Sequence, residues 1–346
     1  MKKHFFAIFI ASLYVSYADT IKFSAMIVDD STKKPMPNVK VCAGFTMDAG
    51  LVWNNRFKHE HKQYLTDVHG SCRISGESNC GKAGCYIDIP PEGYYKPLSG
   101  FSLRYKKESL FGVWQPDNLV VTILLQRVEH PIPLYVSKVH THDIESYYDK
   151  PDSLKELRFD FVAGDWLPPL GIGKNADMII RTEFRLNETI SNRIFKALTY
   201  YDFINKIEFP GAGNGILEKS VEGNLGLKIR IADATGYVPN KILCFGRRQK
   251  KNAVIKGVCP EEYTESDPKR CYCFRVRSQF DEKGNMISAI YGKIYGDFKF
   301  DGFDKKGLTS IEFLYYLNPS SLDRNLEWDM KTNLCPNPGS LNQKQP

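Results

Sequence analysis

Apolar and polar residues alternate along most of the chain, in short runs separated by turns rich in glycine, asparagine and proline. In the first run, Ile21–Val28, the apolar residues Phe23, Ala25 and Ile27 occupy every second position. Period-two alternation is typical of a strand with one buried face. Further strands are predicted at residues 119–125, 157–162, 178–186, 227–232, 271–279, 286–300 and 309–317. Only residues 192–203 favour a helix, so the pattern predicts a mainly β protein.

The first 18 residues have the three parts of a secretory signal peptide. Two lysines are followed by the apolar run Phe5–Val15 and by small residues at Ser16 and Ala18. The run is shorter than the roughly 20 residues that span a bilayer. We therefore expect a secreted or extracytoplasmic protein, in the periplasm or at the cell surface, with no transmembrane segment in the mature chain.

The length of the chain predicts two domains, and its charge distribution argues against a nucleic-acid partner. At roughly 100–200 residues per domain, 346 residues predict two domains, and the stiff, polar segment Glu129–Pro133 marks the break. We predict a signal peptide at 1–18, a domain at 19–128, a linker at 129–156 and a domain at 157–346. The net charge of +7 is spread evenly. We expect no nucleic-acid partner, because no dense basic segment is present.

Several short motifs follow one another in the first domain: Ala25-x-Ile27-x-Asp29, Thr32, Pro35-Met36-x-x-Val39-x-Val41 and Thr66-Asp67-x-x-Gly70-x-Cys72. In order and spacing they resemble the carboxypeptidase regulatory-like domain, a transthyretin-like sandwich of seven strands. The resemblance covers about residues 21–128. It implies a non-catalytic accessory domain with a supporting or binding role.

Motifs in the second half resemble uncharacterised exported bacterial proteins, over about residues 155–338. They include Arg158-Phe159-Asp160-Phe161, Cys271-x-Cys273-Phe274-Arg275 and Tyr291-Gly292-Lys293-Ile294-Tyr295. This resemblance implies no activity and no residue role. The fold predicted for the whole chain is therefore mainly β: a transthyretin-like β-sandwich followed by a larger, mainly antiparallel β domain.

The alternating runs Cys271–Phe280 and Met286–Asp297 predict a hairpin. Between them, Glu282-Lys283-Gly284 suits a three-residue loop with glycine in the left-handed position. In that register Gly292 lies opposite Phe274 on a core face. The other face presents cations and tyrosines that could hold an anionic or sugar-like ligand, and we predict the ligand-binding residues to be Arg275, Arg277, Tyr291, Lys293 and Tyr295. The alternative is an ordinary solvated sheet face, and a one-residue bulge would exchange the two faces.

Nine cysteines in an exported chain favour disulfides. Cys80 and Cys85 bracket a flexible Gly-Lys-Ala-Gly segment and are the first candidate pair. The spacing of cysteines 244, 259, 271 and 273 could hold zinc. We expect no metal and no cofactor, because export and the lack of paired C-x-x-C motifs oppose a zinc site.

His59-Glu60-His61 and His140-Thr141-His142-Asp143 each place two imidazoles on one side of an extended segment, as metal ligands can be placed. Solvated polar loops are the alternative in both cases. No histidine follows His142, which excludes a catalytic triad confined to the second domain. Carboxylate-only hydrolysis remains open, with candidate residues Asp165, Glu312, Asp323, Glu327 and Asp329.

We assign no catalytic residue. The sequence favours an exported, non-catalytic binding or surface-associated protein, with a polysaccharide or another cell-envelope component as its partner. The alternative is a secreted, glycosidase-like hydrolase that uses a carboxylate pair in the second domain.

Overall fold

A computed structural model describes residues 19–48, 57–97, 100–106, 113–141, 156–191, 197–220, 229–249, 260–267, 269–302 and 308–339. Every regular element in these ranges is a β-strand, and none of the described segments forms a helix that could cross a membrane. The chain divides into two compact units, Met1–Val128 and Glu129–Pro346. The predicted signal peptide lies outside the described residues.

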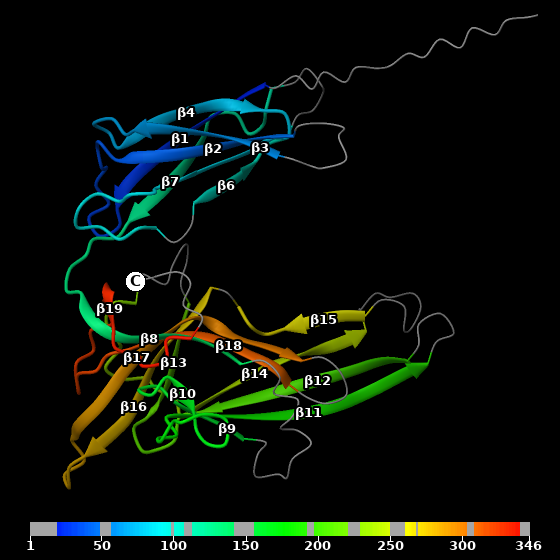
Figure 1. The fold of residues 1–346 in the computed structure, drawn as a ribbon, viewed down its shortest axis with the longest axis vertical. Helices are drawn as coiled ribbons and strands as arrows, with labels where there is room; N and C mark the ends of the chain where they lie inside the picture. The colour runs from blue at the N-terminus through cyan, green and yellow to red at the C-terminus, as the bar shows by residue number, and fades with distance from the viewer. Residues whose placement is uncertain are drawn as a thin grey trace, which may run out of the picture. The chain divides into compact units, whose positions relative to one another are not determined.

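The first unit is a sandwich of two sheets (Figure 1). One sheet has the order β4-β1-β7 and the other the order β3-β2-β5-β6. The strands are β1 (Asp19–Asp29), β2 (Lys40–Asp48), β3 (Phe57–Leu65), β4 (Ser71–Ser78), β5 (Lys82–Tyr86), β6 (Phe101–Arg104) and β7 (Leu119–Leu125). The predicted sandwich of seven strands is confirmed.

Alternation explains which face of each strand is buried. In β1, Phe23, Ala25 and Ile27 are at most 2% exposed, whereas the residues between them face outward. Phe45 of β2 packs against Phe23 from the opposite sheet, with ring centroids 6.4 Å apart. One apolar core therefore joins the two sheets.

The second unit contains two six-stranded sheets, β10-β9-β11-β12-β14-β15 and β13-β16-β17-β18-β8-β19. Nearly all strand pairs are antiparallel, as predicted, and β19 pairs with β8 in parallel. The strands are β8 (Ile132–Thr141), β9 (Glu156–Asp160), β10 (Asp165–Trp166), β11 (Met178–Ser191), β12 (Ala197–Glu208), β13 (Gly215–Ser220), β14 (Asn240–Gln249), β15 (Pro260–Thr264), β16 (Arg270–Phe280), β17 (Met286–Gly302), β18 (Leu308–Leu317) and β19 (Trp328–Asn333).

An aromatic core lies between these two sheets. The ring of Phe161 stacks on Phe274 at 4.3 Å and meets Tyr315 edge-on at 4.9 Å. Phe203 stacks on Phe245 at 4.7 Å. Such ring pairs add to the free energy of burial by about 0.5–1.5 kcal/mol each.

Two element predictions are wrong. The helix predicted for 192–203 is, from Ala197 onward, the strand β12, which pairs with β11 and β14 over almost its whole length. The linker predicted for 129–156 contains β8, which pairs with β18 from Tyr135 to Thr141. In both cases pairing with distant strands outweighs local preference.

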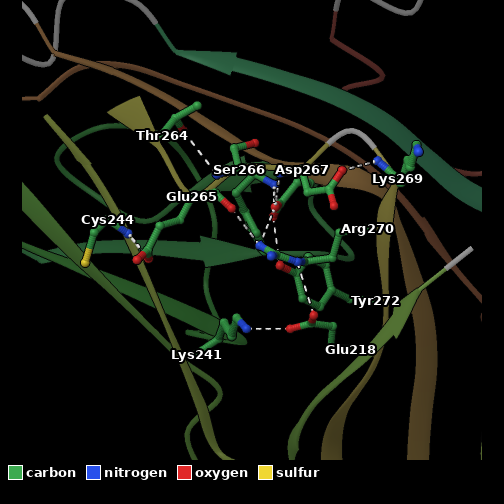
Figure 2. Close-up of polar contacts among 12 residues, drawn as sticks. Glu218, Lys241, Cys244, Thr264, Glu265, Ser266, Asp267, Lys269, Arg270 and Tyr272 are labelled. Atoms are coloured by element: carbon green, nitrogen blue, oxygen red, sulfur yellow. Dashed lines mark hydrogen bonds and ion pairs between the residues drawn. The ribbon is translucent and has the colours of Figure 1, made fainter. Parts of the chain in front are cut away.

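A polar cluster ties the two sheets of the second unit together at one point (Figure 2). Arg270 of β16 bonds Asp297 at 2.8 Å, Glu218 of β13 at 3.2 Å and the carbonyl oxygen of Glu265 at 2.9 Å. Lys241 of β14, in the other sheet, pairs with the same Glu218. The donors of Arg270 are thus engaged within the fold, which indicates a structural role.

Candidate functional site

The predicted β16–β17 hairpin forms in the predicted register. Phe274 lies opposite Gly292, Arg275 opposite Tyr291 and Cys273 opposite Lys293. A methyl group on Gly292 would lie 2.2 Å from the Phe274 ring, so the ring covers the bare glycine as expected.

The face predicted to bind a ligand is largely covered by other parts of the second unit. Residues 229–237 and Leu326 pack on it together with Cys271, Cys273 and Tyr291. Lys293 is 2% exposed and donates to the carbonyl oxygen of Ile229 at 3.1 Å. Burial lowers the pKa of the Lys293 ammonium to about 8. Tyr291 is 4% exposed and Tyr295 is half-buried beside the Trp328 cluster, so these residues do not form an open basic surface.

Arg275 stays on this face but bonds the fold itself. Its side chain donates to the carbonyl oxygens of Gly213 at 2.6 Å and Ala234 at 3.2 Å. Its guanidinium also lies 4.7 Å from the ring centroid of Tyr237. These contacts hold the covering segment onto the hairpin.

Arg277 leaves the face altogether. A register shift after Val276 places Arg277 in the left-handed region, with φ of 55°. Its guanidinium then bonds Asp177 at 2.8 and 2.9 Å and Asp160 at 2.7 Å. The five predicted ligand-binding residues therefore do not form one exposed surface. Arg275, Tyr291 and Lys293 stay on the hairpin face that residues 229–237 cover, and the bulge turns Arg277 away from it.

The two carboxylates held by Arg277 are nearly buried, each side chain being 4% exposed. Burial raises the pKa of Asp177, and the hydrogen bonds from Arg277 offset only part of this rise. Burial acts in the same direction on Asp160, but N–H groups of Lys174, Ala163 and Asn175 outweigh it and lower its pKa. This saturated bonding indicates that the pair organises the loops after β9.

The five carboxylates considered for hydrolysis are held in separate local contacts. Backbone N–H groups donate hydrogen bonds to four of them: Asp165, Asp323, Glu327 and Asp329. The fifth, Glu312, bonds the side chains of two lysines. Their partners belong to different segments of the second unit. The structure does not gather these five residues at one place.

Cys80 and Cys85 do not form the predicted disulfide. Both are free thiols, as are the other six cysteines that the structure describes. Cys85 points into the core from β5, and burial raises its pKa to about 12. Cys80 lies at the turn before β5 and donates to the carbonyl oxygen of Thr46 at 3.2 Å. The turn thus directs the Cys80 thiol to the Thr46 carbonyl group, whereas β5 directs the Cys85 thiol into the core.

The zinc alternative also finds no support in the described residues. Burial raises the pKa of Cys271, and it raises that of Cys273 to about 11, which opposes the thiolate form that binds metal. Cys259, His142 and Asp143 lie outside the described residues. Within the described ranges, no three histidine, cysteine or acidic residues lie together as a metal-binding group.

An open polar surface is found instead on the first unit, on the outward side of the sheet β3-β2-β5-β6. We call it the four-stranded face. Its residues follow from strand pairing: Cys42, Gly44, Thr46, His59, His61, Gln63, Lys82, Gly84, Tyr86, Ser102 and Arg104. Apart from Cys42, all are half-buried or exposed. Val41, Ala43 and Phe45, which alternate with the β2 members, are fully buried.

Two glycines lie side by side in the middle of the four-stranded face. Gly44 pairs with Gly84, and this pair is flanked by His61 on β3 and Ser102 on β6. At Gly84 an added methyl group would lie 2.6 Å from the carbonyl oxygen of Phe101, so the strands require glycine there. The neighbouring rows carry longer side chains. At Gly44 the ring of His61 lies 3.5 Å from where a methyl group would stand, so it covers part of this glycine.

The flanking rows carry the chemistry of the four-stranded face. One row is His59, Thr46, Lys82 and Arg104, and the row on the other side contains Tyr86, which is 37% exposed. Cations, hydroxyl and amide groups and the phenol ring of Tyr86 thus share one side of the sheet. Sequence reasoning singled out His59 and His61 but gave a solvated polar loop as the alternative to a pair of metal ligands. The period-two spacing of His59, His61 and Gln63 was the available signal for an exposed strand face.

No protein-family model and no curated protein matches the sequence. Among solved structures, the chain is similar to the C-terminal domain of shaft pilin SpaA from Lactobacillus rhamnosus GG, at 12% identity over 32% of this chain and 98% of that one, with a TM-score of 0.22. It is also similar to BcpA, the major pilin subunit of Bacillus cereus, at 12% identity over 85% and 95% of the two chains, with a TM-score of 0.23. A streptococcal ancillary pilin aligns over 70% of this chain and 62% of that one, at 10% identity and a TM-score of 0.22. TM-scores this low establish neither a shared fold family nor a shared function.

Proposed function

We propose that this protein is an exported, non-catalytic binding protein that acts at the cell surface or outside the cell. The four-stranded face is its ligand-binding surface. The observation that carries this proposal is a set of exposed polar and aromatic side chains on both sides of the Gly44–Gly84 pair. The signal-like first 18 residues and the resemblance of residues 21–128 to a regulatory-like accessory domain also support export and a non-catalytic role.

The ligand class that fits the four-stranded face is a glycan that carries acidic groups, as many cell-envelope polysaccharides do. Tyr86 offers an exposed ring on which a sugar can stack. Lys82 and Arg104 lie directly opposite each other and supply charge-assisted hydrogen bonds to a carboxylate. Gly84 lets a sugar ring approach the backbone, because only backbone atoms of Phe101 and Ser102 lie near the position of a side chain there.

A glycan array, run beside turnover assays on the same polysaccharides, tests this proposal. We expect retention of acidic glycans without product. Arg104→Glu and Tyr86→Ala should each weaken retention roughly tenfold, the effect of ~1.4 kcal/mol. Neither change should lower the melting temperature, because both side chains are exposed.

Arg73→Glu is the matched control. Arg73 is an exposed arginine of β4, on the other sheet of the same unit, and its reversal should leave retention unchanged. Equal losses in the Arg73 and Arg104 variants would show that net charge alone attracts the glycan. Product formation by the wild-type protein would contradict the non-catalytic assignment.

The second candidate function is a secreted hydrolase with a carboxylate pair. Its supporting observation is that Asp160 and Asp177 meet at one guanidinium and have pKa values shifted in opposite directions. Their burial and backbone bonds favour the structural role described above. The turnover assays decide between the two functions.

A further inference from the structure

His59 and His61 are two positions apart in β3 and lie on the same side of it. β3 is the outer strand of its sheet. Both residues are exposed. Their ring centroids are 6.5 Å apart and the ring planes are inclined by 43°. The two imidazoles therefore face the same volume of solvent.

This separation is close to that of two imidazoles bound to one metal ion. With metal–nitrogen distances of ~2.0–2.1 Å and tetrahedral angles, the two ring centroids lie roughly 5 Å apart. The observed 6.5 Å must close by a little more than ~1 Å. Rotation about the side-chain torsions of two exposed residues achieves this without moving the strand.

Neighbouring groups prepare the two rings for binding. The Nδ1 atom of His59 lies 3.2 Å from the hydroxyl oxygen of Thr46, on the adjacent strand. This hydrogen bond orients the ring and leaves Nε2 available. In metal sites, a hydrogen bond to the ring nitrogen that does not bind the metal orients a ligating histidine in the same way. His61 lies opposite Gly44, and a methyl group at that glycine would be in ordinary contact with the ring, at 3.5 Å.

The charges next to these histidines in the sequence belong to the other face of the strand. Lys58, Glu60 and Lys62 alternate with the histidines, and Glu60 pairs with Lys62 at 3.2 Å. Repulsion of a cation by these lysines is therefore weaker than the linear sequence indicates, because water screens charges on an exposed strand.

We infer that His59 and His61 chelate a late first-row divalent metal ion, with water in the remaining positions. Imidazole suits zinc, nickel and copper, and Cu²⁺ binds such ligands most strongly. The described residues add no third histidine, cysteine or acidic ligand, so the site is open and the metal exchangeable. The inference does not rest on glycan binding.

Calorimetry with Zn²⁺ and electron paramagnetic resonance with Cu²⁺ test the inference on the full chain. We expect one ion per chain at this site and a Cu²⁺ spectrum that shows coupling to two imidazole nitrogens. His59→Ala and His61→Ala should each weaken binding on the order of 10²-fold, because the second ligand no longer acts at high effective concentration.

The decisive control exchanges two neighbours, Glu60→His with His61→Glu. This variant keeps the number of histidines and the charge but places adjacent imidazoles on opposite faces of β3. It should bind as weakly as His61→Ala. Wild-type affinity in the exchanged variant, or a wild-type Cu²⁺ spectrum with one nitrogen, would overturn the inference. His69→Ala, in the exposed turn before β4, should bind as the wild type does.

Discussion

Arg277 shows how one arginine can organise a buried polar region. It is the sole link described between β16 and both Asp160 and Asp177, and it adopts the left-handed conformation needed to reach them. An arginine between two nearly buried carboxylates offsets the cost of removing their charges from water. Its presence on β16 is therefore explained by the loops that it holds.

Arg277→Ala should lower the free energy of unfolding of the second unit by about 3–5 kcal/mol at pH 7, because two buried carboxylates lose their counter-charge. The difference should shrink toward pH 4. Asp160 has a lowered pKa in the wild type, so its contribution is present above the unfolded value and is lost as the pH falls. In the variant both carboxylates protonate more readily, which relieves the unpaired charge. Urea unfolding of both proteins at pH 7 and pH 4 measures this difference.

Arg275→Ala is the matched control, since its partners are backbone carbonyl oxygens. Arg275→Ala should lower the free energy of unfolding by less than Arg277→Ala does, and this loss should change little between the two pH values. A loss in the Arg277 variant that is equally large at both pH values would indicate that the side chain stabilises the unit by packing alone.

At the scale of single elements, the β16–β17 hairpin shows what local sequence can and cannot predict. The alternation and the Gly284 loop suffice to give the register, because a three-residue loop with a left-handed glycine fixes the pairing of the strands. The bulge after Val276 does not interrupt the alternation of apolar and polar residues in the sequence, so the direction of the Arg277 side chain could not be predicted. The segment that covers Lys293 comes from residues more than 50 positions away, and local pattern carries no information about it.

Gly292→Ala should destabilise the hairpin by about 1–3 kcal/mol, because the new methyl group would lie 2.2 Å from the Phe274 ring in a packed core. Thermal unfolding of the variant measures the cost. Combining it with Phe274→Leu should recover part of the loss, which would appear as coupling in a double-mutant cycle.

Gly44→Ala, whose methyl group meets only ordinary contacts at 3.5 Å, should unfold close to the wild-type temperature. Strictly additive effects of the Gly292 and Phe274 changes would show that the ring does not cover the glycine.

At the scale of the whole molecule, fold class followed from the sequence whereas the boundaries of the second unit did not. Strand alternation is a local property, and it sufficed to predict two β units. The sequence indicates a linker at β8 because Pro131, just before the strand, and Pro133, its second residue, are typical of a break. Leu134 and Val136 of β8 are nevertheless fully buried, and the strand lies between β18 and β19. Pairing partners from the far end of the chain therefore define where the second unit begins.

We predict that residues 19–128 and 129–346 each fold when expressed alone, because each unit has its own apolar core. Calorimetry should show one cooperative transition for each fragment, at the temperatures found for the full chain. A fragment that begins at residue 142 lacks β8 and exposes the edges of β18 and β19, so it should fail to fold or should aggregate. Folding of the 142–346 fragment with wild-type stability would show that β8 is dispensable, and failure of 19–128 alone would show that the first core does not suffice without the rest of the chain.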